Sequence, residues 1–278
     1  MKKINRRSFL AAAGLTAAAL ALTACGGSAS STASSTASSA ASSEAASTSA
    51  AAELTTVEAG KLTMATNATF PPYEMTTDSG EIEGIDVDTA KAIAEKLGLE
   101  LQIDDMEFDA ALLSVQQGKA DIVMAGVTVT DERKAVMDFS DSYATGIQSI
   151  IVPNDSDIAS PDDLAGKKIG TQRGTTGYIY CSDDFGEDSV VAYDSGLTAV
   201  QALNNGQVDA VVIDNAPATE YVAANPGLKV LDTSYAEEDY AIGMAKGSAL
   251  EDAVNKALEE LKADGTLQAI VDKYINAN

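Results

Sequence analysis

Arg133 is the residue whose type and position point most directly to binding chemistry. Thr130 has the properties of a helix N-cap, and Asp131 and Glu132 would occupy the first helical turn. A capping box would place Glu or Gln three residues after the cap, where this chain has Arg133. A cation opposes the helix macrodipole at this end. A bound anion shared with the helix N–H groups would remove the conflict; the alternative is a side chain turned outward to a surface Asp or Glu.

The elements that would position Arg133 alternate between strand and helix. Short apolar runs predict strands, and amphipathic segments closed by glycine predict helices. This alternation is typical of an α/β fold with mostly parallel sheets flanked by helices. The expected strands are 61–66, 99–103, 120–125, 167–171 and 208–213, and the expected helices are 85–97, 108–117 and 197–205.

Two segments share one pattern. DAALLSVQQGKADIVMAG (109–126) and GLTAVQALNNGQVDAVVID (196–214) match in hydrophobic pattern and in the placement of Gly and Asp. Any helix–Gly–strand unit has part of this pattern, so it indicates two similar lobes without proving a duplication.

Polar residues follow the expected strands. In open parallel sheets, ligands bind outside the carboxyl ends of the strands, which here lead into residues 67–70, 126–133, 172–176 and 214. These positions contain Arg133 and Arg173, the two arginines that follow residue 24, together with hydroxyl groups and the Asp214 carboxylate. Such a set suits a zwitterion, because a guanidinium matches a carboxylate and a carboxylate matches an ammonium.

The N-terminus predicts export. Lys2, Lys3, Arg6 and Arg7 precede an apolar run that is shorter than the roughly 20 residues of a spanning helix. The run ends in Leu-Thr-Ala-Cys, which resembles a lipobox, so residues 1–24 are the expected lipoprotein signal peptide and Cys25 the expected lipidation site. A plain signal peptide cut nearby is the alternative. The paired arginines leave both the general and the twin-arginine export routes open.

Residues 25–53 are expected to form a disordered tether, because they are nearly all Ser, Ala and Thr and contain no large apolar side chain. The remaining 225 residues or so are enough for two lobes. Lobe 1 is expected at 54–144 and 241–278 and lobe 2 at 145–240, with crossover hinges near 142–148 and 236–240.

Composition excludes several function classes. After residue 24 the chain has 14 basic and 42 acidic residues, a formal net charge of −28 that argues against nucleic acid or anionic lipid as a partner. It has no His, and Cys181 is its only Cys beyond Cys25, so intramolecular disulfides, His-based triads and His-ligated metal sites are excluded. The acidic clusters lack the residue spacing of an EF-hand loop, so the sequence does not support a calcium site there. We expect no cofactor and no metal.

Several segments carry a resemblance to a known family. They are TNATFPPYEM (66–75), GIDVDTAKAIAEKLG (84–98), EFDAALLSVQQGKADIVMAGVTVTDER (107–133), DFSDSY (138–143) and DAVVIDNAPA (209–218). With these motifs in order, residues 62–274 resemble the substrate-binding lipoproteins of polar amino-acid ABC transporters, the bacterial extracellular solute-binding proteins of family 3, which include glutamine-binding proteins. The resemblance implies a type II periplasmic-binding-protein-like fold, in which two α/β lobes close on an amino acid in the cleft between them.

The resemblance also implies residue roles. The α-carboxylate of the ligand would bind Arg133, the N–H of Thr128, and Thr175 or Thr176. The α-ammonium would bind Asp214, the Gly126 carbonyl and the Thr128 hydroxyl, while Phe70 and Phe108 would flank the ligand. Asn67, Gln172 and Arg173 stand where relatives vary with the ligand side chain. Taken singly, the aromatic residues suit a core, Thr128 a solvated loop and Asp214 a helix cap.

One departure bears on the substrate. Relatives that take glutamine or cationic amino acids often have Asp at the position of Asn67, and a neutral amide cannot neutralise a cationic side chain. This disfavours a strongly cationic substrate. Arg173 either faces an acidic or polar ligand side chain or points to solvent.

The expected function is the binding component of an amino-acid ABC importer. The protein would be a monomer, attached to the outer face of the cell membrane only through its lipid, and would pass a polar amino acid to a permease without being an enzyme. The alternatives are an enzyme on the same fold, such as cyclohexadienyl (arogenate) dehydratase, for which Asp214 and Glu74 are the available acids, and a sensory ligand-binding module.

Overall fold

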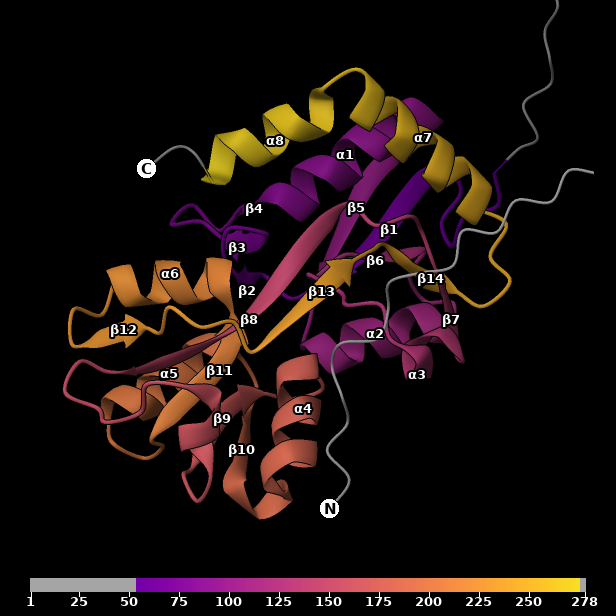
Figure 1. Cartoon of the computed structure of the whole chain (residues 1–278). Coiled ribbons are helices and arrows are strands. Elements are labelled where there is room, and N and C mark those ends of the chain that lie inside the picture. Colours follow the sequence, from indigo (N-terminus) through magenta and orange to yellow (C-terminus); the bar gives the residue numbers. More distant parts are fainter. Residues whose placement is uncertain (1–53, 276–278) are drawn as a thin grey trace, which may run out of the picture. The chain divides into compact units, whose positions relative to one another are not determined.

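A computed structural model describes residues 54–275 of the 278-residue chain (Figure 1). The predicted signal peptide, Cys25 and the tether lie outside the described residues, as do residues 276–278. Within the described range, no helix has the length and apolar character needed to cross a membrane.

The first sheet has five strands in the order β5-β1-β6-β14-β7. β1 pairs in parallel with β5 and β6, whereas β14 runs antiparallel to both β6 and β7. The strands are β1 (Lys61–Thr66), β5 (Glu100–Asp105), β6 (Ile122–Val123), β7 (Met137–Phe139) and β14 (Gly243–Ala245).

The second sheet has six strands. Five follow the order β10-β9-β11-β8-β12, and β13 also pairs with β8. β9 is parallel to β10 and β11, while the long strand β8 is antiparallel to β11, β12 and β13. The strands are β8 (Ala144–Pro153), β9 (Ile169–Gln172), β10 (Val190–Tyr193), β11 (Ala210–Asp214), β12 (Leu228–Val230) and β13 (Ala236–Tyr240).

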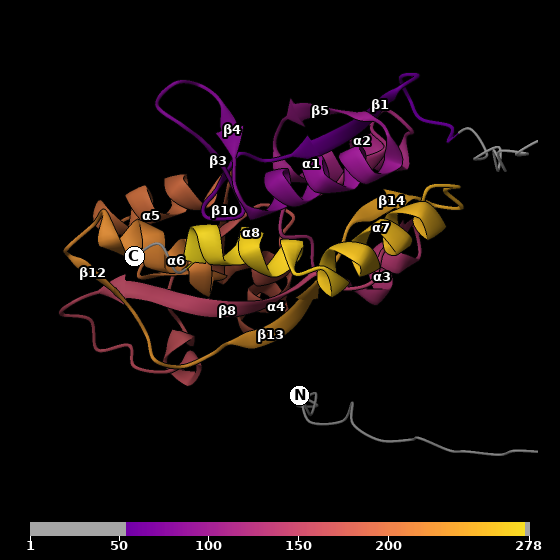
Figure 2. The same ribbon diagram turned by 90° about the horizontal axis from the view of Figure 1, so that it is seen from above.

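Helices cover both sheets (Figures 1 and 2), and the longer ones do so because an amphipathic helix buries its apolar stripe against a sheet. On the first sheet, α1 and α7 pack against the face that carries Leu62 and Met64, and α2 packs against the face that carries Ala65 and Val123. The helices are α1 (Ile85–Leu97), α2 (Phe108–Gln116), α3 (Asp131–Lys134), α4 (Thr176–Phe185), α5 (Gly196–Asn204), α6 (Asn215–Ala223), α7 (Glu251–Ala263) and α8 (Thr266–Ile275), with short 3-10 turns η1 (Pro161–Leu164) and η2 (Glu187–Ser189).

The chain passes between the two sheets twice. It leaves the first sheet after β7 and enters the second at β8, and it returns from β13 to β14. β8 and β13 pair side by side, with Ala144 opposite Tyr240. The expected lobe boundaries at 144/145 and 240/241 and the expected hinges stay predictions.

The predicted α/β alternation is confirmed, and most expected elements begin and end within two residues of their predicted bounds. The sheets are mixed rather than mostly parallel, because β8, β13 and β14, which belong to or flank the two passages, run antiparallel to their neighbours. The expected strand 120–125 is shorter than predicted, although the N–H groups of Asp121 and Met124 still bond to carbonyls of β1.

The two matching segments form matching units. α2 leads to β6 beside β1, and α5 leads to β11 beside β9, so each unit adds its strand to the same side of the preceding parallel pair. Gly118 and Gly206 follow the two helices with φ values of 64° and 67°, a conformation that favours glycine.

A three-stranded sheet of β2 (Thr69–Phe70), β3 (Glu74–Thr76) and β4 (Ile82–Glu83) joins β1 to α1. Gly84 ends this sheet and directly precedes α1. Its φ is 143°, and a Cβ atom there would lie 2.1 Å from the carbonyl oxygen of Tyr73. The first N–H groups of α1 donate to Pro72 and Tyr73, so this close approach sets the position of Glu74 relative to α1.

We predict that Gly84→Ala lowers the free energy of unfolding by about 2 kcal/mol or more, because the new methyl group must displace backbone. Gly80→Ala is the matched control. Gly80 has a φ of 83° but no atom within 4 Å of a new Cβ, so its substitution should cost only the backbone strain of about 1 kcal/mol. Urea denaturation measures both, and equal losses would contradict the steric account.

Candidate functional site

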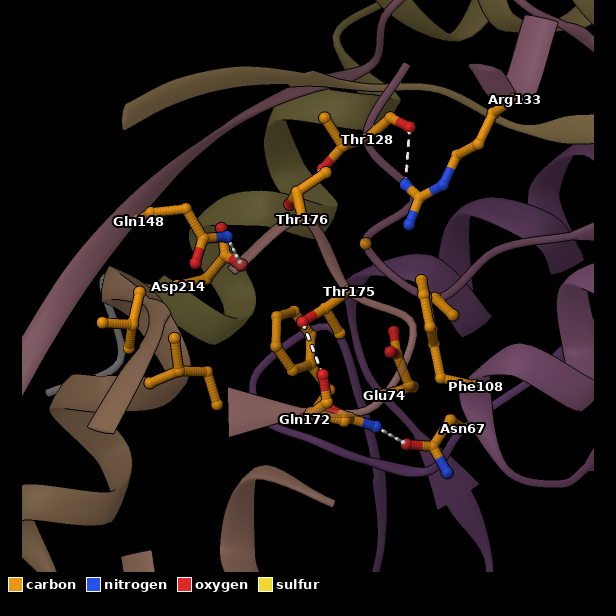
Figure 3. Close-up of a pocket in the computed structure, with 15 residues that line it drawn as sticks. Asn67, Glu74, Phe108, Thr128, Arg133, Gln148, Gln172, Thr175, Thr176 and Asp214 are labelled. Atoms are coloured by element: carbon orange, nitrogen blue, oxygen red, sulfur yellow. Dashed lines mark hydrogen bonds between the residues drawn. The ribbon is translucent and has the colours of Figure 1, made fainter. Parts of the chain in front are cut away.

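A pocket lies where the parallel strands of both sheets end (Figure 3). β1 and β6 lead into it from the first sheet, and β9 and β11 from the second. Its free space is about 20 Å³, close to what one water molecule needs, so an amino acid fits only if the walls move apart. The lining residues are Asn67, Phe70, Glu74, Phe108, Ala125, Gly126, Thr128, Arg133, Gln148, Gln172, Thr175, Thr176, Val212, Ile213 and Asp214.

Arg133 lies inside this pocket and is 9% exposed. Its N–H donates to the Thr130 hydroxyl at 3.2 Å, as expected for an N-cap. The guanidinium donates from Nη1 to the Thr128 carbonyl (2.7 Å) and from Nη2 to the Gly174 carbonyl (3.1 Å), and it lies 5.4 Å from the centre of the Phe108 ring. Three of its five N–H groups therefore remain for a ligand.

The local setting of Arg133 differs from the expectation in one respect. The helix that it occupies, α3, is a single turn of four residues. A helix this short has little macrodipole, so the guanidinium itself is the main attraction for an anion.

Asp214 is the last residue of β11 and is buried. It accepts hydrogen bonds from the Tyr240 hydroxyl and from Nε2 of Gln148 (2.6 Å), and its side chain does not cap α6. Burial raises the pKa of Asp214 to about 7; the hydrogen bonds oppose the rise, and the nearby Glu238 charge adds to it. A cation would stabilise the ionised form.

Glu238 adjoins the pocket and was missed by the sequence analysis. One of its oxygens accepts hydrogen bonds at 3.0 Å from Thr128, Thr176 and Gln148, and its charge opposes the fall that burial causes in the pKa of Arg133. The alternation of β13, in which Glu238 and Tyr240 point inward, could have revealed it.

The two sheets are joined across the pocket by side chains at their strand ends. Nε2 of Gln172 donates to Oδ1 of Asn67 at 2.8 Å (Figure 3). Nδ2 of Asn67 in turn donates to the Met106 carbonyl at 2.9 Å. Both side-chain groups of Asn67 thus have protein partners. Gln148 of β8 also lines the pocket and was not predicted.

The three threonines predicted to contact the ligand, Thr128, Thr175 and Thr176, all line the pocket. Thr128 and Thr176 approach each other from opposite sheets, with their hydroxyl oxygens 3.5 Å apart and both bonded to Glu238. Thr175 is the N-cap of α4: its hydroxyl accepts from Tyr178 N–H and donates to the Gln172 carbonyl at 2.8 Å.

Two aromatic rings form apolar walls. Phe108, the first residue of α2, faces the Arg133 guanidinium. Phe70 of β2 covers Gly126, where a Cβ atom would lie 2.8 Å from the ring, and Gly126 has a φ of 55°. Gly126 therefore lets the ring and the backbone approach closely.

Glu74 is the second acid that lines the pocket, and it is fully buried. Neither of its carboxylate oxygens accepts a hydrogen bond from an N–H or O–H group among residues 54–275, and its hydrogen-bonding neighbour is the Asp86 carboxyl, to which a protonated Glu74 can donate. Burial, and next the Asp86 charge, raise the pKa of Glu74 well above its ordinary value. Sequence reasoning considered Glu74 only as an acid for the enzyme alternative, because one Glu in a turn-rich loop gives no sign of burial.

Arg173 is outside the pocket. Its side chain is 54% exposed, pairs with Asp194 at 3.4 Å and donates weakly to the Ala192 carbonyl. The buried neighbour Gln172 lines the pocket, whereas Arg173, one residue further, is exposed. We therefore withdraw Arg173 from the ligand contacts; the solvent-facing alternative fits the structure.

The described part of the chain contains no cluster of three or more acidic or Cys side chains placed to hold a metal ion. Cys181 is buried in the core of the second sheet.

The fold matches that of known proteins. A structure described as the arginine-, lysine-, histidine-binding protein ArtJ from Geobacillus stearothermophilus has a TM-score of 0.75 and 35% identity, covering 78% of this chain and 96% of that one. An ancestral arginine-binding protein is 43% identical in its arginine-bound structure and 42% in its glutamine-bound structure, with TM-scores of 0.74 and 0.73 and coverage of 78% of this chain and 98% of that one.

Sequence comparisons agree. The L-cystine-binding protein TcyJ of Escherichia coli (strain K12) is 33% identical over 225 residues, which is 80% of this chain and 85% of TcyJ. Residues 62–277 match the family described as bacterial extracellular solute-binding proteins, family 3. Two sheets with a polar pocket at their facing strand ends, and a family match over most of the chain, lead to one conclusion: the chain belongs to family 3 of the bacterial extracellular solute-binding proteins.

Proposed function

We propose that the protein is the substrate-binding component of an amino-acid ABC importer, and that it holds one amino acid in this pocket and delivers it to a permease. The observation that carries the proposal is the pair Arg133 and Asp214, a buried cation and a buried acid that line one pocket from opposite sheets. Relatives are named for binding cystine, arginine, lysine or histidine, which supports transport rather than catalysis.

In the proposed complex, the α-carboxylate of the ligand binds the remaining N–H groups of Arg133, and the α-ammonium binds Asp214. Arg133 already contacts Gly174 of the other sheet. A ligand held between Arg133 and Asp214 would contact both lobes and stabilise the closed form, since these contacts exist only when the lobes meet. The narrow free space supports entry by a hinge opening.

The side-chain end of the ligand would face Glu74. An unpaired buried carboxylate costs free energy, and a guanidinium or ammonium would supply the missing partner. We therefore propose an amino acid with a cationic side chain, arginine first, as in the relatives named for arginine. This replaces the interpretation drawn from Asn67, whose amide is already bonded to Gln172 and Met106; the acid comes from Glu74 instead.

We further propose that Cys25 carries a lipid, that residues 25–53 tether the binding domain to the outer face of the membrane, and that the protein acts there as a monomer. The family's extracellular location supports this arrangement. A tether without large apolar side chains would let the domain reach a membrane-bound permease.

Arg133→Ala should weaken arginine binding by about 2–5 kcal/mol, because the ligand carboxylate would be buried without a partner. Arg173→Ala removes the other arginine of the described domain, from the surface, and should bind arginine as the wild type does. Isothermal titration calorimetry measures both. Near-wild-type affinity in Arg133→Ala would refute the carboxylate assignment.

Asp214→Asn should abolish the preference for arginine over its deaminated analogue, because the ammonium loses its counter-charge. In the wild type, the ammonium binds the ionised form of Asp214, whose pKa in the empty pocket is about 7. Affinity for any α-amino acid should therefore fall as the pH is lowered through about 7. If the variant still prefers arginine to the analogue, the ammonium lies elsewhere.

A thermal-shift screen of the twenty amino acids and cystine should give the largest rise in melting temperature with arginine or lysine. Binding at a hundred times Kd stabilises the native state by about 2.7 kcal/mol. Glu74→Gln should move the largest shift to a neutral amino acid such as glutamine. An unchanged ranking in this variant would show that Glu74 does not contact the side chain.

A further inference from the structure

Glu74 and Asp86 form a buried pair of acids beside the pocket. Asp86, in the first turn of α1, is fully buried, and its two oxygens accept hydrogen bonds from the N–H of Gly126 (2.9 Å) and the hydroxyl of Tyr143 (2.7 Å). Glu74 has no such donors. The contacts of Gly84 with Tyr73 fix the two acids relative to each other, because they bring the start of α1 against the strand that carries Glu74.

The two acids differ in what stabilises their charge. Two donors stabilise ionised Asp86, whereas ionised Glu74 would be a buried charge without a donor to stabilise it. The groups that act on Glu74 come from several elements and add no positive charge: Asp86 of α1, Asp105 of β5 and Asp214 of β11, with the tyrosines Tyr73, Tyr143 and Tyr221 beside it. Arg133, the cation that lines the pocket, donates to two carbonyls that follow strands of the two sheets, those of Thr128 and Gly174.

These surroundings favour a neutral Glu74 when the pocket is empty. Burial and the Asp86 charge raise the pKa of Glu74 well above its ordinary value, and burial raises the pKa of Asp86 to about 6. Because two hydrogen-bond donors stabilise the ionised form of Asp86 and none stabilises that of Glu74, the proton resides on Glu74.

We propose that the Glu74–Asp86 pair holds one proton in the empty pocket, located on Glu74, and that this proton decides which ligand side chain binds. A cationic side chain takes the place of the proton, so Glu74 becomes a carboxylate, the proton passes to solvent and the ligand keeps its own charge. A neutral amide leaves the proton in place and accepts a hydrogen bond from the Glu74 hydroxyl. This inference rests on the proposed function, and it makes selectivity between cationic and neutral amino acids depend on pH.

Asp86 is a positioning residue in this scheme, because it does not line the pocket. It holds Gly126, which does line the pocket, and its charge keeps the proton on Glu74. It also adds a second negative charge beside the site that the ligand cation would occupy.

The test is calorimetry of L-arginine and L-glutamine with the wild-type protein between about pH 5 and 8. Titrations in two buffers with different enthalpies of ionisation give the number of protons released. Both ligands carry an ammonium for Asp214, so any proton lost there cancels in the difference. Below the pKa of Glu74 in the empty pocket, arginine should release about one proton more than glutamine, and the ratio of their association constants should fall up to tenfold per pH unit as the pH is lowered.

Three variants identify the source of the proton. Glu74→Gln should remove the extra proton and weaken arginine binding at least about thirtyfold while glutamine still binds. In Asp86→Asn, the pH at which the ratio of the arginine and glutamine association constants falls should be about one unit lower. The reason is that Glu74 loses a negatively charged neighbour, which lowers its pKa. Asp121→Asn is the matched control: Asp121 is a buried carboxylate that accepts two backbone N–H groups at 2.8 Å and does not line the pocket, so the pH profile should stay in place.

The outcomes separate this inference from the proposed function. If both amino acids bind and release equal numbers of protons over the whole range, the proton is not displaced and the inference fails while the proposed function stands. If Asp86→Asn leaves the pH dependence of the arginine-to-glutamine ratio unchanged, Asp86 does not take part in the scheme. If neither amino acid binds, the proposed assignment of a cationic substrate fails and the inference fails with it.

Discussion

The charges enclosed between the two sheets need partners, and the behaviour of the pocket follows from which of them have one. A buried charge without a hydrogen-bond partner costs several kcal/mol in effective terms. In the empty pocket the Arg133 guanidinium donates hydrogen bonds to backbone carbonyls. The Asp214 carboxylate accepts hydrogen bonds from Tyr240 and Gln148, whereas no group donates a hydrogen bond to Glu74. An amino acid with a cationic side chain carries three charged groups. Its carboxylate complements Arg133, its ammonium complements Asp214, and its side-chain cation complements Glu74.

The architecture delivers these groups from both sides of a narrow space. Strand ends supply Asn67 and Gly126 on one side and Gln172 and Asp214 on the other. The paired strands β8 and β13 contribute Gln148 and Glu238, so the connections between the sheets take part in the polar network as well as joining the lobes. Opening the pocket therefore breaks specific hydrogen bonds, and a ligand must replace them to favour closure.

Much of the fold was predictable because its signals are local. Glycine-closed amphipathic segments marked α1, α2 and α5, and apolar runs marked the central strands. The direction of β8 and β14 was not predictable, since antiparallel pairing depends on where the chain crosses between the sheets.

The site was predictable where residue type and strand-end position coincide, as for Arg133, Asp214, Thr128 and Gln172, all of which line the pocket. Their contacts with a ligand stay predictions. Arg173 met the same criterion, but its side chain is exposed and pairs with Asp194 outside the pocket. Glu74 was not predicted as a ligand contact because its importance comes from burial between segments far apart in the chain, which no local pattern records, whereas the alternation along β13 was a local signal for Glu238.

A crystal structure of the protein grown with L-arginine tests the central claim most directly. The account predicts closed lobes, with the ligand carboxylate within about 3 Å of the Arg133 guanidinium, its ammonium at a similar distance from Asp214, and its guanidinium paired with Glu74. An arginine bound in the reverse orientation, or outside this pocket, would contradict it.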